Sequence, residues 1–309
     1  MENYGIYEDI AKRTGGDIYV GVVGPVRCGK STFITQFMQN LVVPNIADKN
    51  VKERTIDELP QSADGKTIMT TQPRFIPNKA AAIRVGDKVD MNVRMIDCVG
   101  YLIDGALGHE EGNRQRLVKT PWLEEEIPFE QAAELGTKKV IDEHSTIGIV
   151  LTTDGTITDI PRSSYVAAEE RVVSELSGQN KPFVIVLNTK APKSEEAKKL
   201  SASLSKKYGV PVLPIDVLKL NQANIDEIFE KILLEFPIKS LKVKMPKWMQ
   251  ALSFDDPIIS NVISEIKKFG ENANKIGQID KTNVAFLESE DFEPVVISSI
   301  KMGEGKVYF

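Results

Sequence analysis

The 309-residue chain has few of the residues that disulfide frameworks, metal clusters or membrane spans require. It contains two cysteines and two histidines, and His109 and His144 lack any ligand spacing. No apolar run approaches the ~18 residues of a membrane-spanning helix, and the acidic N-terminus lacks the apolar core of a secretory signal. These absences favour a reducing, cytoplasmic compartment and predict no transmembrane segment.

Positive charge is also in short supply. Lysine and arginine together number 39 against 44 acidic residues, which gives a net charge of −5. This balance argues against charge-driven binding to nucleic acid, and the lysines of residues 239–247 are interpreted as a solvated linker. We therefore expect no nucleic-acid partner.

What the sequence does contain is a phosphate-binding motif. The stretch VGVVGPVRCGKSTF carries G-x-x-x-x-G-K-S between an apolar run and a series of apolar residues at helical spacing. Lys30 is expected to reach the β- and γ-phosphates, and the Ser31 hydroxyl to ligate Mg²⁺. Arg27 is interpreted as a surface or partner contact. The predicted cradle comprises Gly24, Pro25, Val26, Arg27, Cys28, Gly29, Lys30, Ser31 and Thr32.

A hairpin follows, because AAAIRV and VDMNVRMID are separated by three turn-forming residues, too few for a crossover helix. It ends in Asp97-Cys98-Val99-Gly100, a D-x-x-G motif. At this place Asp97 can hold Mg²⁺ through water, and the Gly100 N–H can meet the γ-phosphate.

The polar stretch 45–72 supplies the candidate switch residues. Thr70 and Thr71 are expected to close on Mg²⁺ and the γ-phosphate, with Thr67 as a weaker candidate and Thr70 as a metal ligand. The alternative, strand threonines without a ligand, stays open. Since Tyr101 stands where many GTPases place a water-orienting glutamine, we expect slow or partner-dependent turnover, with Thr70 or Thr71 positioning water.

Alternation of strands and helices defines the predicted fold. STIGIVLTTDG, KPFVIVLNTK and VPVLPIDVLKL are interpreted as strands, with helices at residues 129–143, 163–176, 194–208 and 225–234. The expected class is α/β: a P-loop NTPase of the GTPase-like (TRAFAC) branch, with a mostly parallel sheet, one antiparallel strand, helices on both faces and a small C-terminal α+β extension.

Base recognition departs from that branch. The guanine-reading motif N-K-x-D is replaced by Asn188-Thr189-Lys190-Ala191, which lacks the carboxylate. We expect Asn188 and Lys190 to lie at the nucleotide and favour ATP, while GTP stays open.

The stretches IAKRTGGDIYVGVVGPVRCGKSTFI, DELPQSADGKTIMTTQPRFIPN, DCVGY and EHSTIGIVLTTDGTITDI resemble the stage IV sporulation protein A family over roughly residues 1–250. The resemblance implies an ATPase whose hydrolysis drives a conformational change and self-association into a polymer, the basement of the spore coat. It implies a place in the mother-cell cytoplasm at the forespore outer membrane, with a small amphipathic membrane-anchoring peptide and other spore coat proteins as partners. It also implies Lys30 as the Walker A lysine, Asp97 as the Walker B-like aspartate, and Thr70 with Thr71 as sensors.

The expected domains are an ATPase domain at 1–238 and, at 239–309, a linker with the start of an incomplete middle domain, because family members are longer. Pro257 should open an amphipathic helix capped by Asp255 or Asp256, its apolar stripe packed on its own protein. A piece of this kind should bind nucleotide yet assemble poorly. Two alternatives remain: a regulatory GTP-binding switch, and a scaffold that binds ATP without hydrolysing it.

Overall fold

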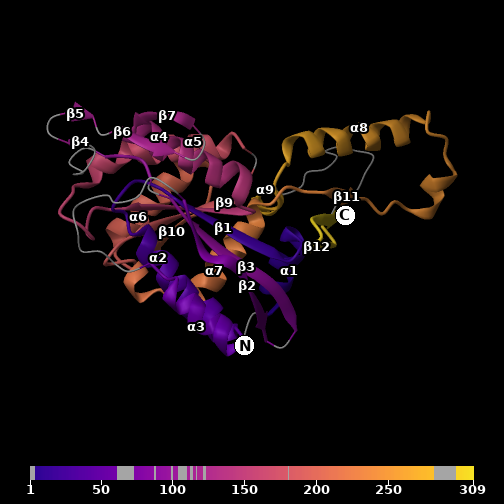
Figure 1. The fold of residues 1–309 in the computed structure, drawn as a ribbon. Coiled ribbons are helices and arrows are strands. Elements are labelled where there is room, and N and C mark those ends of the chain that lie inside the picture. The colour runs from indigo at the N-terminus through magenta and orange to yellow at the C-terminus, as the bar shows by residue number, and fades with distance from the viewer. Residues whose placement is uncertain are drawn as a thin grey trace.

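The computed structural model describes residues 4–60, 73–86, 88–98, 100–103, 110–111, 114–115, 117–120, 123–179, 181–281 and 297–309. Its main sheet has the strand order β10-β9-β8-β1-β3-β2. All neighbours in this sheet are parallel except β2 and β3, which form the predicted antiparallel hairpin. The predicted α/β class is confirmed (Figure 1).

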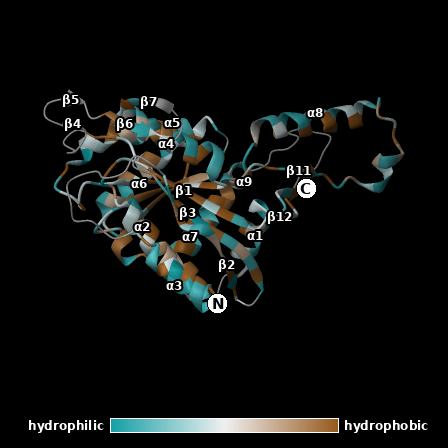
Figure 2. Ribbon diagram, viewed as in Figure 1, coloured by the Kyte–Doolittle hydropathy of each residue, from teal (hydrophilic) through white to brown (hydrophobic). Residues whose placement is uncertain are grey.

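The strands of this sheet are β1 (Asp17–Val23), β2 (Arg74–Val85), β3 (Val89–Asp97), β8 (Ile147–Thr153), β9 (Phe183–Asn188) and β10 (Val212–Ile215). Every residue of β8 and β9 is buried, as expected of central parallel strands covered on both faces. Near the edge, β3 alternates between buried and exposed positions over most of its length. Figure 2 accordingly shows hydrophobic colour concentrated in the middle of the domain.

The helices are α1 (Tyr4–Thr14), α2 (Lys30–Phe37), α3 (Lys49–Asp57), α4 (Phe129–Lys139), α5 (Val166–Ser177), α6 (Glu195–Tyr208), α7 (Gln222–Glu235), α8 (Pro257–Asn272) and α9 (Ile276–Lys281). One face of the sheet carries α1, α2 and α7, held together by edge-to-face rings: the Phe229 ring lies 5.7 Å from Tyr7 and 5.9 Å from Phe37. The other face carries α4 and α5 (Figure 1). There α6 joins α5 through a hydrogen bond of 2.8 Å from the Tyr208 hydroxyl to Glu169.

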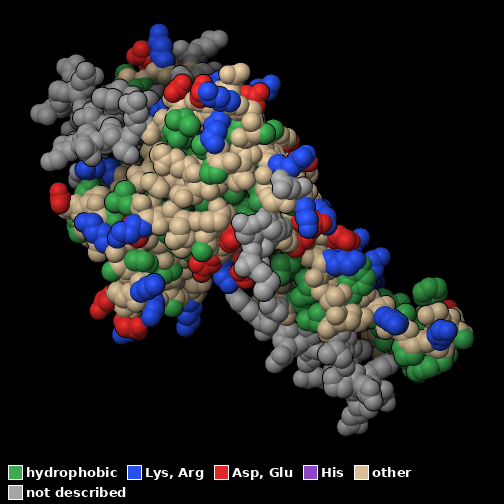
Figure 3. Space-filling view, turned by 90° about the horizontal axis from the view of Figure 1, so that it is seen from below, with side chains coloured by type: hydrophobic (Ala, Val, Ile, Leu, Met, Phe, Trp, Pro, Cys, Tyr) green, Lys and Arg blue, Asp and Glu red, His purple; other side chains and the backbone are tan. Residues whose placement is uncertain are grey.

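Beyond Pro237 the chain forms a smaller unit. Strands β11 (Ser240–Lys242), β13 (Lys306–Tyr308) and β12 (Ser299–Lys301) make a sheet in that order, and Phe269 of α8 packs edge-to-face on Phe309. The segment leading into α8, together with that helix, forms an arm that projects from the domain (Figure 1). Hydrophobic side chains gather at the end of the arm (Figure 3), where Phe254 lies and is 84% exposed. Trp248, in the segment leading into α8, is 59% exposed.

The helix expected from Pro257 is confirmed, and its N-cap is Asp256, whose carboxylate accepts from the Ile258 N–H at 2.9 Å. Ile259 and Val262 of its stripe are buried against Met249, within this chain. Among the described residues no helix combines the length and the apolar character needed to cross a bilayer.

Two features escaped the sequence reading. The polar stretch after α2 contains α3, which Asp48 caps by accepting from the backbone N–H groups of Asn50 and Val51. Between Asp97 and α4, where the sequence analysis names no strand, β6 (Leu117–Thr120) and β7 (Leu123–Pro128) pair antiparallel, and the short β4 (Glu110–Glu111) and β5 (Arg114–Gln115) pair likewise.

Candidate functional site: a nucleoside triphosphate cradle

The predicted cradle is a loop between β1 and α2, at the carboxyl edge of the parallel strands. Gly24 leaves β1 with φ 145°, and a Cβ there would lie 2.1 Å from the Leu151 carbonyl oxygen of β8. Gly29, the N-cap of α2, has φ 99°, and its Cβ would meet the Asn188 amide at 2.5 Å. Both positions therefore require glycine, which lets the loop approach its neighbouring strands closely.

Lys30 is the first residue of α2 and is 6% exposed. Its ammonium donates to the carbonyl oxygens of Pro25 at 2.6 Å and Gly24 at 3.3 Å, so the positive charge lies within the loop itself. Together with the positive end of the helix dipole, this places charge where an anionic phosphate chain would bind.

Other loop residues are fixed by their backbones. Cys28 is fully buried, and its carbonyl accepts from Asn188. Arg27 has φ 61°, a left-handed backbone conformation that is uncommon for residues other than glycine. The side chains of Arg27 and Thr32 are half-buried. Pro25 and Val26 run beside Tyr101, to which the Val26 N–H donates at 2.8 Å.

A candidate cation site lies between α2 and the end of β3. The Ser31 hydroxyl donates to Asp97 Oδ2 at 3.1 Å. The other oxygen, Asp97 Oδ1, is buried and has no hydrogen-bond partner within the described part of the chain. Burial raises the pKa of this carboxyl above its usual range, against the opposing effect of the Lys30 charge. A buried carboxylate oxygen with spare lone pairs beside a hydroxyl fits a hard, oxygen-binding cation such as Mg²⁺.

Gly100, the last residue of D-x-x-G, touches the cradle. With φ 86°, its Cβ would lie 2.2 Å from the Gly24 carbonyl oxygen and 2.5 Å from Lys30 Nζ. The fold thus brings together Lys30, Ser31, Asp97 and Gly100, as the sequence predicts.

Asn188, the last residue of β9, braces the phosphate loop, in the sense that its side-chain amide hydrogen-bonds to the loop backbone and to the segment after β10. Its Nδ2 donates to the Cys28 carbonyl at 3.1 Å, and its Oδ1 accepts from the Val217 N–H at 3.3 Å. Both ends of the amide are engaged, which favours a supporting role. Direct contact of Asn188 with nucleotide stays a prediction.

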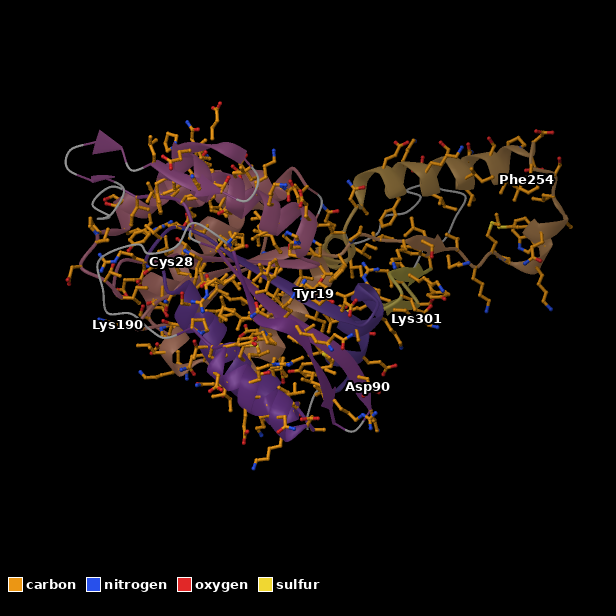
Figure 4. All side chains as sticks on the ribbon, viewed as in Figure 1. Tyr19, Cys28, Asp90, Lys190, Phe254 and Lys301 are labelled. Carbon is orange, nitrogen blue, oxygen red and sulfur yellow. The ribbon has the colours of Figure 1, made fainter. Side chains whose placement is uncertain are left out.

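Lys190 is exposed at the same edge, and its side chain stays a predicted nucleotide contact. Its backbone N–H donates to Thr156 Oγ1 at 3.1 Å, in the loop after β8. In Figure 4, Cys28 and Lys190 lie on the side of the domain away from Phe254 at the end of the arm.

The two cysteines are buried free thiols. Burial raises the pKa of Cys98 to about 11, and that of Cys28 also rises for the same reason. Both therefore remain protonated and chemically quiet at neutral pH.

The switch candidates Thr70, Thr71 and Thr67 lie outside the described residues, so their roles stay predictions. Sequence reasoning missed the brace by Asn188 and the strand-like pairing of Tyr101 with the loop, since both depend on contacts between distant segments. The only sequence signal for the pairing of Tyr101 was that a tyrosine follows D-x-x-G where many GTPases have a glutamine.

A phosphate loop after β1, a serine and an aspartate at a candidate cation site, and a D-x-x-G glycine against the loop are the features of a P-loop NTPase fold with a mostly parallel sheet. The family model described as "Stage IV sporulation protein A, ATPase domain" matches residues 1–237, and "Stage IV sporulation protein A, middle domain" matches residues 238–309. The chain belongs to the stage IV sporulation protein A family and carries its ATPase domain.

Curated relatives agree. The chain is 51% identical over 305 residues to stage IV sporulation protein A of Clostridioides difficile (strain 630) and 46% identical to that of Bacillus subtilis (strain 168). These matches cover 99% of this chain but 62% of each relative. Among solved structures, the FeoB G-domain from Methanococcus jannaschii aligns with 71% of this chain and 97% of its own at 13% identity and a TM-score of 0.35, too slight a likeness to carry an argument.

Proposed function

We propose that the chain is a slow, Mg²⁺-dependent ATPase whose hydrolysis of ATP to ADP and phosphate drives a conformational change and self-assembly into the basement layer of the spore coat. The observation that carries the enzymatic part is the contact of four groups at one edge: the Lys30 ammonium, the Ser31 hydroxyl, the Asp97 carboxylate and Gly100. The assembly part rests on the family to which the chain belongs.

Each group has a role that its surroundings support. Lys30 and the loop N–H groups bind and orient the phosphates, and Ser31 with Asp97 would hold Mg²⁺. When bound, the cation supplies positive charge that offsets the charge of the phosphate oxygens. Thr70 and Thr71 are the proposed sensor and water-positioning residues, with Thr70 as a further metal ligand.

ATP is the proposed nucleotide because the carboxylate that would read guanine is absent. The segment after β9 contains Thr189 and Lys190, neither of which is a carboxylate. Thr189 is fully buried, and its N–H donates to the Ile215 carbonyl. The carboxylate that follows β10, Asp216, is ion-paired with Lys219 at 3.0 Å. Adenine requires no such acceptor pair.

The proposed place of action is the mother-cell cytoplasm, at the forespore outer membrane. The proposed partners are further copies of the protein, a small amphipathic membrane-anchoring peptide and other spore coat proteins. We also propose residue 238 as the boundary between the ATPase domain and the start of the middle domain.

Phosphate release tests the proposal. Wild type, Lys30→Ala and Thr70→Ala/Thr71→Ala are compared with ATP and with GTP, with and without Mg²⁺. We expect ATP-specific, Mg²⁺-dependent release that either substitution abolishes or strongly reduces. A preference for GTP would favour a regulatory switch, tight ATP binding without release would favour a scaffold, and an unchanged rate in the threonine variant would remove their proposed role.

A further inference from the structure

Tyr101 directly follows the glycine that meets the cradle, and it is 3% exposed. We propose that Tyr101 is a positioning residue for the terminal phosphate: it fixes Gly100 against the cradle and joins it to α5, so that the site distinguishes a nucleoside triphosphate from a diphosphate. The inference rests on the proposed function and concerns the same site.

The backbone of Tyr101 pairs with the cradle in the manner of a parallel strand. Its N–H donates to the Gly24 carbonyl at 3.3 Å, and its carbonyl accepts from the Val26 N–H at 2.8 Å. Gly100 therefore directly precedes a residue whose backbone N–H and carbonyl are both hydrogen-bonded to the phosphate loop. This pairing holds Gly100 beside Lys30, and the D-x-x-G motif assigns the N–H of its glycine as a donor to the γ-phosphate.

The side chain of Tyr101 extends the connection to the helices on the outer face. Its hydroxyl donates to Glu175 Oε2 on α5. Burial raises the pKa of this phenol, and Glu175 raises it further, so the hydroxyl keeps its proton throughout the neutral range. The Tyr101 hydroxyl therefore stays a donor to the Glu175 carboxylate, and hydrogen bonds to a charged acceptor are stronger than those between neutral groups.

Arg171 completes the link. Its guanidinium lies over the Tyr101 ring, 5.3 Å from the centroid. Its Nε is 3.8 Å from Glu175 Oε1, and its Nη1 is 2.5 Å from Glu134 Oε1 on α4. The ring and the hydroxyl are thus held from α5, which α4 in turn supports.

This anchoring bears on one part of the ligand. A donor that is already fixed binds without a further cost in backbone ordering, whereas a loosened donor must pay that cost when it meets its acceptor. Gly100 is the proposed donor to the γ-phosphate, which a diphosphate lacks. Removing the anchor of Tyr101 should therefore lower the affinity for a triphosphate and leave the affinity for a diphosphate, which is bound by Lys30 and the rest of the cradle, unchanged.

The test is a calorimetric titration of wild type and Tyr101→Phe with ADP and with a non-hydrolysable ATP analogue, both in Mg²⁺. The phenylalanine keeps the ring under Arg171 and removes the hydroxyl. We expect the affinity for the ATP analogue to fall about three- to tenfold, the loss of one hydrogen bond, with the affinity for ADP unchanged within about twofold.

Tyr7→Phe is the matched control. Tyr7 is also 3% exposed and donates to a helix carboxylate, Asp226, but it lies on α1, between helices on the opposite face of the sheet. We expect it to leave both affinities unchanged.

A second pair of variants tests the partner on α5. Glu175→Gln keeps an acceptor oxygen and should retain the preference for triphosphate, whereas Glu175→Ala should reproduce Tyr101→Phe. This pair also decides the matter if Tyr101→Phe fails to fold.

Equal losses for both nucleotides in Tyr101→Phe, or a similar loss in Tyr7→Phe, would reduce Tyr101 to a packing residue and overturn the inference. So would a wild type that shows no preference for the triphosphate, or one whose preference survives in both Tyr101→Phe and Glu175→Ala. A wild type that binds neither nucleotide would overturn the proposed function, and the inference with it.

Discussion

Asn188 offers a direct test of how the phosphate loop is held. Its side chain is 6% exposed and makes two hydrogen bonds, to the Cys28 carbonyl at 3.1 Å and from the Val217 N–H at 3.3 Å. Replacing it with alanine leaves both backbone groups without these partners in a buried place. Each such loss costs about 1–3 kcal/mol, and because both bonds are slightly long we expect the lower part of that range for each. Asn188→Ala should therefore reduce the free energy of unfolding by about 2–4 kcal/mol.

The same change should loosen the cradle, because the carbonyl that it releases belongs to the loop. We expect weaker binding of both ATP and ADP, since the brace supports the loop that holds all the phosphates. Asn188→Asp separates the two bonds: its oxygen can still accept from Val217, but a carboxylate cannot donate to Cys28. It should lose as much nucleotide affinity as the alanine variant.

Urea unfolding and nucleotide titration measure the two effects. Asn92→Ala is the control, because Asn92 of β3 donates an exposed side-chain hydrogen bond of 2.9 Å to Asp17, the first residue of β1, at the opposite end of that strand from the phosphate loop. It should change the free energy of unfolding by less than about 0.5 kcal/mol. A change that small in Asn188→Ala, or a large loss of stability with unaltered nucleotide affinity, would refute the claim that this amide positions the loop.

Three further changes test other contacts. Gly100→Ala should lower ATP hydrolysis by at least about tenfold, because its Cβ would overlap the cradle; Gly16→Ala has a similar φ of 89° with open space around it and should keep its phosphate release. Asp97→Asn should raise the thermal midpoint in EDTA, because burial raises the pKa of Asp97 and makes its ionised form costly at neutral pH. The same change should abolish any stabilisation by Mg²⁺ in thermal melts, because it removes the proposed carboxylate ligand. Asp90→Asn, which changes an exposed ion pair with Arg84, should have neither effect. Glu169→Gln should lower the free energy of unfolding by about 1–3 kcal/mol in urea, because this fully buried carboxylate loses its 2.7 Å ion pair with an arginine; an unchanged midpoint would contradict the importance of that pair.

The sequence predicted the parts of this molecule that local pattern controls. The phosphate loop, the hairpin and the buried strands β8 and β9 follow from glycine spacing, a three-residue turn and continuous apolar runs. The brace by Asn188 could not be predicted in the same way, because its partner Cys28 lies 160 residues away and the pattern does not show which strand ends are adjacent. Asn188 was predicted to lie at the nucleotide; the structure shows both ends of its amide hydrogen-bonded to backbone groups, and its contact with nucleotide stays a prediction.

The positions of Asn188 and Glu235 identify the element that joins the nucleotide edge to the smaller C-terminal unit. Asn188 holds Val217, and α7 starts five residues later at Gln222. This helix packs on α1 and α2 through Phe229 and ends at Glu235, whose carboxylate is 9% exposed and ion-paired with Lys275 at 2.7 Å. A helix of 14 residues is about 21 Å long and is stiff over that length. α7 therefore connects the backbone that Asn188 holds at Val217 with the Glu235–Lys275 ion pair at the start of the C-terminal unit.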